Sequence, residues 1–170
     1  DRQSVQKQLG LEDQGVVVTE GFSQWVLEDN FCAGRPAWEE VGVTMVDDVT
    51  PFEHMKLRML NGTHSTLAYL GFIAGHEFVA DAANDSDFQQ LLLEMWQDEI
   101  IPTLSMPVGI DLQAYAHDLM ARYQNPELHH RLYQIAMDGS QKLPQRLLGT
   151  LRDHLAANRL PKRVLLAIAG

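Results

Sequence analysis

A helical pattern over residues 50–71 constrains the fold of this chain more than any other segment. Thr50 is a suitable N-cap, Pro51 takes the first helical position, and Glu53 stands three residues after the cap, as in a capping box. Apolar residues then recur around most of the helix circumference as far as Gly71. Because a helix that is apolar on most sides is usually buried among other elements, we expect it to be the central helix of a multi-helix domain.

Four more helices are predicted downstream, each from a start signal that is followed by apolar residues at helical spacing. The residues that start them are Ser86, Asp111, Asn125 with Pro126, and Pro144. Pro102 is expected to end the first of these helices, and Gly139 to take the position just after the end of the third.

The first 48 residues follow a different pattern. Short β-prone runs at residues 15–19 and 41–46 are separated by turn-forming residues, which predicts strands and loops. We therefore predict a mainly α fold, in which a strand-containing lead of residues 1–48 precedes a helical domain of residues 49–170.

Composition restricts the partners and the setting. The 170 residues suffice for one ordinary core, and the formal net charge of −10 argues against nucleic acid as a partner. Cys32 is the only cysteine, so no intrachain disulfide is possible and a reducing, cytoplasmic setting fits best. No uncharged apolar run approaches the roughly 20 residues of a membrane span, so no membrane partner is expected. The chain begins without Met and stops inside the apolar stretch 164–169, so we expect a piece of a longer protein.

Three polar side chains stand on the long helix among core leucines. At about 100° per residue, Lys56, Asn61 and His64 share one arc of the helix. Burying a cation and an amide costs several kcal/mol unless they are paired or functional. One interpretation is structural: Lys56 reaches solvent, Asn61 pairs with backbone, and His64 is a satisfied core histidine.

The other interpretation is catalytic. A lysine removed from water loses affinity for its proton and can then exchange one with an alcohol or a carbonyl. In that case Asn61 can donate to the oxygen on which charge develops, and His64 can orient the substrate through a second hydroxyl.

Two motifs in this order resemble a known family. Residues 56–64 (KLRMLNGTH) resemble the K-x-x-x-x-N-x-x-H signature of the long-chain polyol dehydrogenases, the family of mannitol 2-dehydrogenase and fructuronate reductase. Residues 138–146 (DGSQKLPQR) resemble the second signature of that family. Residues 22–31 and 47–51 are also similar to the family, except that Gly21 stands where a proline is common.

The resemblance implies a metal-independent, NAD-dependent secondary-alcohol dehydrogenase. It implies that Lys56 is the general acid/base, Asn61 the amide that stabilises the oxyanion, His64 a substrate-positioning imidazole and Lys142 a substrate-binding cation. It also implies a helical substrate domain like the C-terminal domain of 6-phosphogluconate dehydrogenase, with residues 1–48 as the tail of a Rossmann domain. No G-x-G-x-x-G occurs in the sequence, so that Rossmann domain is expected as a partner upstream, where NAD binds.

The substrate stays open between two classes. The motifs look closest to those of fructuronate reductases, which act on sugar acids, and a neutral polyol is the alternative. A sugar acid needs a cation for its carboxylate; Lys142 is the candidate, and Arg131 or Arg146 can supply a second contact. Gln134 stands where an arginine is expected in some polyol-oxidising relatives. A helical interaction module without chemistry of its own is the rival hypothesis.

A metal site is not expected. His76 and Glu77 begin like H-E-x-x-H, but Ala80 stands where the second histidine is required. His129 and His130 are neighbours near a predicted helix start, so at least one of them is expected to face solvent, as surface histidines usually do.

Overall fold

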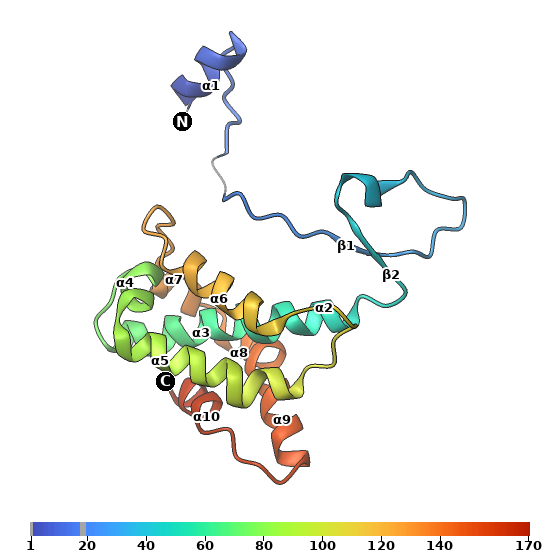
Figure 1. Ribbon diagram of the computed structural model, residues 1–170. Helices are drawn as coiled ribbons and strands as arrows, with labels where there is room; N and C mark the ends of the chain where they lie inside the picture. Colours follow the sequence, from blue (N-terminus) through green and yellow to red (C-terminus); the bar gives the residue numbers. More distant parts are fainter. Residues whose placement is uncertain (1, 18–19) are drawn as a thin grey trace. The chain divides into compact units, whose positions relative to one another are not determined.

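Helices predominate among residues 2–17 and 20–170, which are the residues that the computed structural model describes (Figure 1). The predicted mainly α fold class is confirmed. The contacts divide the chain into two units, Asp1–Asp47 and Asp48–Gly170. None of the helices in the described part of the chain is long and apolar enough to cross a membrane.

The first unit contains one helix and a small sheet. Its elements are α1 (Arg2–Leu9), β1 (Val26–Glu28), the 3₁₀ helix η1 (Trp38–Val41) and β2 (Thr44–Val46). The two strands are parallel, with Val26 opposite Thr44. Gly42, with a φ of 92°, follows η1 in the left-handed conformation and leads the chain into β2.

Only part of the strand prediction is correct. In the predicted strand 41–46 the second half forms β2, whereas Val41 belongs to η1. The predicted strand 15–19 is wrong for residues 15–17, which form a turn and irregular backbone, and its last two residues lie outside the described part. The patterns missed β1 and α1.

The second unit consists of helical segments, several of which continue one another without a break. They are α2 (Thr50–Met55), η2 (Lys56–Gly62), α3 (Thr63–Thr66), η3 (Leu67–Gly71), α4 (Val79–Asn84), α5 (Ser86–Glu94), η4 (Met95–Ile100), η5 (Ile101–Thr103), α6 (Leu112–Tyr123), α7 (Leu132–Ala136), α8 (Gly139–Leu143), η6 (Pro144–Leu148), α9 (Gly149–Ala156) and α10 (Lys162–Ala169). Of the η segments, η2, η3, η4 and η6 are π-helical and η5 is a 3₁₀ turn.

The long helix predicted over residues 50–71 is present as α2, η2, α3 and η3. Its apolar residues form the centre of the core; Met59, Leu67 and Ala68 have no exposed surface. The two π segments end at Gly62 and Gly71. A Cβ on Gly62 would stand 2.8 Å from the backbone oxygen of the residue it faces on η6, so the absence of a side chain lets these two helices touch.

Aspartates accept hydrogen bonds from backbone N–H groups at the start of three helices. Asp111 caps α6, as predicted, and accepts hydrogen bonds from two backbone N–H groups. At α2 and α5, however, the predicted caps Thr50 and Ser86 are the first helical residues. Asp48 accepts from the backbone N–H of Thr50, and Asp85 accepts from that of residue 87. A carboxylate that lies before the helix, two residues before Thr50 and one residue before Ser86, replaces the predicted hydroxyl.

The helix predicted to start at Pro126 begins instead at Leu132. Asn125 accepts a hydrogen bond from the backbone N–H of residue 127, which makes a turn rather than a helix start. Arg131 then forms a β-bridge with Phe78, which holds the chain extended up to α7.

Gly139 does not follow the end of that helix but begins α8. The left-handed conformation falls on Asp138, with a φ of 60°. Pro144 does not start a helix either, because α8, η6 and α9 are continuous. A proline inside a helix cannot donate the usual hydrogen bond, and the π segment η6 begins at this residue.

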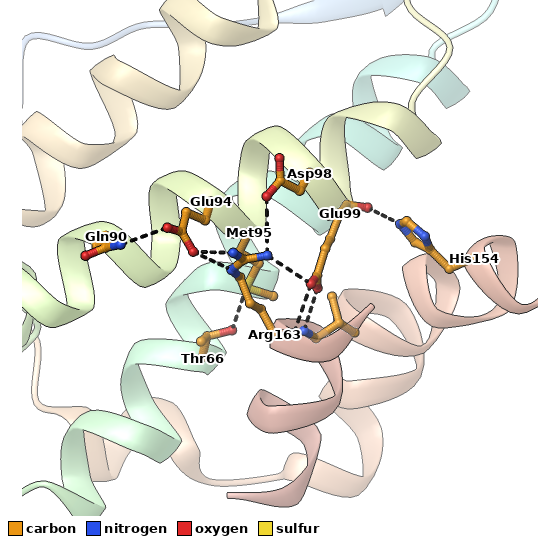
Figure 2. A network of polar contacts seen from close by, with 9 residues as sticks. Thr66, Gln90, Glu94, Met95, Asp98, Glu99, His154 and Arg163 are labelled. Carbon is orange, nitrogen blue, oxygen red and sulfur yellow. Dashed lines mark hydrogen bonds and ion pairs between the residues drawn. The ribbon is translucent and has the colours of Figure 1, made fainter. Parts of the chain in front are cut away.

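A buried carboxylate joins the end of η4 to the start of α10 (Figure 2). Glu99 is 5% exposed and accepts hydrogen bonds from the backbone N–H groups of Arg163, at 3.0 Å, and Val164, at 2.8 Å. The guanidinium of Arg163 also contacts Glu94 and Asp98. Glu99 therefore satisfies the first backbone donors of α10 from another helix.

Candidate active site

A cavity of about 360 Å³ lies between the long helix, the segment before α7, and the helix formed by α8 and η6. Its walls are formed by His64, His129, His130, Arg131, Gln134, Ile135, Lys142 and Arg146. Three of these side chains are permanent cations and none is a carboxylate, although the chain carries a formal net charge of −10.

His64 stands on α3, directly after the first π segment, and is half-buried. Its ring lies parallel to that of Tyr123, with the centroids 5.7 Å apart, and the edge of the His130 ring lies 6.0 Å away. Burial, with the positive charges of His130, Arg146 and Lys142, lowers the pKa of His64 to about 4. The imidazole is therefore neutral at physiological pH and can both donate and accept a hydrogen bond.

The ring of Tyr123, on which His64 stacks, is held in place by hydrogen bonds of its hydroxyl group. Its hydroxyl donates to the backbone oxygen of Leu60 at 2.6 Å and lies 3.0 Å from the hydroxyl of Thr63. Burial raises the pKa of Tyr123 strongly, so the phenol stays protonated and keeps its donor. The backbone oxygen of Met59 likewise accepts from the indole N–H of Trp96 at 2.9 Å. Two carbonyls of the first π segment are thus bonded by side chains of other helices, which anchors the turn before His64.

Lys142 and Arg146 enter the cavity from the helix formed by α8 and η6. The Lys142 ammonium donates to the backbone oxygen of Ile135 at 3.1 Å. The Arg146 guanidinium donates to the hydroxyl of Ser65 at 3.0 Å. This contact joins the second signature segment to Ser65, the residue that directly follows the first one.

Lys56 and Asn61 do not line this cavity. Lys56 is exposed and Asn61 is half-buried. Both residues belong to the π segment η2, where hydrogen bonds run from i to i+5. The structure brings His64 and Lys142 to one cavity, and Lys56 and Asn61 are not among the residues of its walls.

The sequence patterns did not place His129 and His130 at this site. Both are exposed, whereas at least one was expected to be, and both line the cavity. The β-bridge between Phe78 and Arg131 holds the segment before α7 against the start of α4, and the ring of His130 lies 6.0 Å from that of His64 on the long helix. Contacts between segments so far apart in sequence leave no local pattern.

Residues 48–170 match the family model of the mannitol dehydrogenase C-terminal domain. The chain belongs to this family. The D-mannonate oxidoreductase of Escherichia coli (strain K12) is 51% identical over 99% of this chain and 35% of its own length. Among solved structures, a D-sorbitol dehydrogenase in substrate-free form is 37% identical with a TM-score of 0.90, over 98% of this chain and 34% of its own. The mannitol 2-dehydrogenase of Pseudomonas fluorescens, in a ternary complex with NAD and D-mannitol, is 40% identical with a TM-score of 0.85, over 99% and 34%.

The chain spans about a third of the length of the curated relatives that it matches. The relatives named above are polyol or sugar-acid oxidoreductases, which confirms the predicted family. Both signature segments, residues 56–64 and 138–146, fall inside the matched range. Within the described residues of the domain, no three His, Cys, Asp or Glu side chains are placed to hold a metal ion together.

Proposed function

We propose that this chain is the substrate-side domain of an NAD-dependent secondary-alcohol dehydrogenase that interconverts a sugar acid and its keto form, D-mannonate and D-fructuronate. The observation that carries this proposal is the cation-lined cavity: three permanent cations and no carboxylate in its walls. A six-carbon acid supplies the missing negative charge. The identity to a D-mannonate oxidoreductase supports the same substrate class.

In the proposed reaction the residues of this chain bind, orient and move a proton. Lys142 binds the substrate carboxylate, and the neutral imidazole of His64 holds a substrate hydroxyl. Lys56 takes the proton of the reacting alcohol or returns it to the carbonyl, and Asn61 donates to the same oxygen as charge develops. NAD, when bound, accepts or supplies the hydride.

We assign no cofactor-binding residue to this chain. Its sequence has no G-x-G-x-x-G, the motif whose backbone holds a pyrophosphate at a helix start. We propose that residues 1–48 are the tail of a Rossmann domain, that NAD binds mainly to the upstream part of that domain, and that residues 49–170 form the substrate domain. The ternary complex of the P. fluorescens mannitol 2-dehydrogenase supports NAD as the cofactor.

A neutral polyol is the second candidate substrate. It is favoured by the structural likeness to the D-sorbitol dehydrogenase and the mannitol 2-dehydrogenase. No observation favours a module without chemistry over either dehydrogenase.

The variant Lys142→Met in the full-length enzyme separates the two substrates. Removing the cation that pairs with a buried carboxylate costs about 2–5 kcal/mol. We expect kcat/KM for D-fructuronate to fall by the factor that corresponds to this free energy, and kcat/KM for a neutral ketose to fall much less. Steady-state kinetics on both substrates measure the difference.

Lys162→Met is the matched control, because Lys162 is an exposed lysine on α10 and does not line the cavity. This variant is expected to leave kcat/KM for both substrates unchanged. Equal losses on the acid and the neutral ketose in the Lys142 variant would contradict the sugar-acid proposal and favour the polyol.

A further inference from the structure

Three cations line the cavity, but their surroundings differ. Arg131 has a side chain that is 62% exposed, its guanidinium lies 2.6 Å from the carboxylate of Glu77, and it stacks 5.3 Å above the ring of Phe78. Its charge is already balanced. Lys142 and Arg146 are each half-buried, and their hydrogen bonds go to neutral groups, a backbone oxygen and a serine hydroxyl.

No carboxylate forms an ion pair with Lys142 or Arg146 anywhere in residues 2–17 and 20–170. The two residues are four apart on the helix formed by α8 and η6 and face the same cavity. Two unpaired cations on one face of a helix repel each other, and partial burial makes the missing counter-charge more costly. An anion between them removes both penalties.

The surroundings of Arg146 also leave donors available. A guanidinium has five N–H groups, and in the described part of the chain the Arg146 guanidinium makes one hydrogen bond, to Ser65. That bond fixes its direction beside His64. The remaining N–H groups suit the two oxygens of a carboxylate.

We propose that Arg146, and not Arg131, is the second cation that binds the carboxylate of the substrate, together with Lys142. The inference rests on the proposed function and deepens it, because it names the pair of side chains that selects an acid over a neutral sugar. His64 and Arg146 act on different parts of the substrate: the imidazole meets a hydroxyl, and the guanidinium meets the carboxylate. The low pKa of His64, to which both Arg146 and Lys142 contribute, agrees with two uncompensated cations beside it.

The test compares Arg146→Gln with Arg131→Gln in the full-length enzyme, on D-fructuronate and on D-fructose as the neutral ketose. The same change is made at two cations of one cavity, so Arg131→Gln is the matched control. In Arg146→Gln, KM for D-fructuronate is expected to rise by about 30-fold or more, since a lost partner of a buried charge pair has at least that effect. We expect the rise in KM for D-fructose to be much smaller than that for D-fructuronate in Arg146→Gln, and the rise in KM for D-fructuronate to be much smaller in Arg131→Gln than in Arg146→Gln.

Two further variants separate binding from structure. Arg146→Lys keeps the charge but loses the paired N–H groups, so its effect on KM for D-fructuronate is expected to be smaller than that of Arg146→Gln. Ser65→Ala removes the hydrogen bond that orients Arg146, and it is expected to raise KM for D-fructuronate but not for D-fructose. Thermal unfolding of each variant checks that the fold is intact.

Equal effects of Arg146→Gln on the two substrates, or a larger acid-specific effect of Arg131→Gln, overturn the inference. The proposed function fails in a different experiment, namely when the wild type prefers the neutral ketose and Lys142→Met affects both substrates equally. An acid-specific Lys142→Met together with a silent Arg146→Gln leaves the proposed function intact and overturns only the role of Arg146.

Discussion

Lys56 and Lys142 belong to the two signature segments, yet their surroundings differ. The ammonium of Lys142 donates to a backbone oxygen and faces the cavity, whereas Lys56 is exposed at the start of η2. A lysine that exchanges protons with a substrate needs a site from which water is excluded. We therefore expect the part of the protein outside this chain to cover Lys56 in the complete enzyme.

The variant Lys56→Ala in the full-length enzyme tests the proton-transfer role. Turnover is expected to fall by about 10²-fold or more, because a positioned acid/base contributes about 10²–10⁴ to the rate, while the affinity for NADH stays close to that of the wild type. Stopped-flow kinetics and a fluorescence titration with NADH measure the two quantities. Partial rescue by small amines supports the role, and near-normal turnover would indicate a lysine that is only solvent-exposed.

His64 makes the stability of the fold depend on pH over a defined range. Its pKa is about 4 in the folded chain, because of burial and the charges of His130, Arg146 and Lys142, and about 6.5 in the unfolded chain. Between these values the unfolded state binds the proton and the folded state does not. Stability is therefore lost as the pH falls from about 6.5 to about 4, by up to about 3 kcal/mol, and His64 adds no pH dependence above this range.

Urea unfolding at pH 7.5 and pH 4.5 checks this expectation. The loss of stability between the two pH values should be smaller in His64→Gln than in the wild type. His117→Gln replaces an exposed histidine and should keep the wild-type loss. Identical losses in the wild type and His64→Gln would show that the imidazole does not stay neutral in the folded chain.

At the level of elements, the contact between the long helix and the second signature helix depends on Gly62. A Cβ at this position would lie 2.8 Å from the backbone oxygen of Arg146, which is closer than real Cβ contacts allow. Gly62→Ala is therefore expected to push η2 and η6 apart and to reduce the free energy of unfolding by about 1–3 kcal/mol. Because η6 carries Arg146, KM for the substrate should rise as well.

Denaturant unfolding and steady-state kinetics measure the two effects of Gly62→Ala. The control is Gly21→Ala, because a Cβ at Gly21 meets no atom within 4 Å. It is expected to change neither quantity. A fully stable Gly62→Ala with a normal KM would mean that the two helices can separate without consequence for the site.

Sequence patterns predicted the long helix and the family, but not the details of the helices. Apolar spacing located residues 50–71 because burial on most sides leaves a strong pattern. The same spacing could not reveal the π segments, and of the three polar residues predicted on one arc only His64 lines the cavity. The start at Leu132 was also missed, because Pro126 is a common first helical residue and the β-bridge of Arg131 that delays the helix is a distant contact.

At the level of the whole molecule, this chain is a third of the length of its relatives, and hydride transfer requires a nicotinamide held against the substrate carbon. We expect the isolated chain, residues 1–170, to show no turnover of D-fructuronate with NADH. The absorbance of NADH at fixed protein concentration measures this. The full-length enzyme serves as the positive control. Turnover by the isolated chain would contradict the proposal that NAD binds mainly outside this chain.

The carboxylate of Glu99 sets an order of assembly. It meets α10 through residues 64 and 65 positions later in the chain, and α10 has only eight residues, too few to be a stable helix alone in water. During synthesis Glu99 leaves the ribosome well before α10 does. The carboxylate that caps α10 is therefore already present when this helix emerges. Helix α10 thus becomes ordered only when it meets a carboxylate that was made earlier.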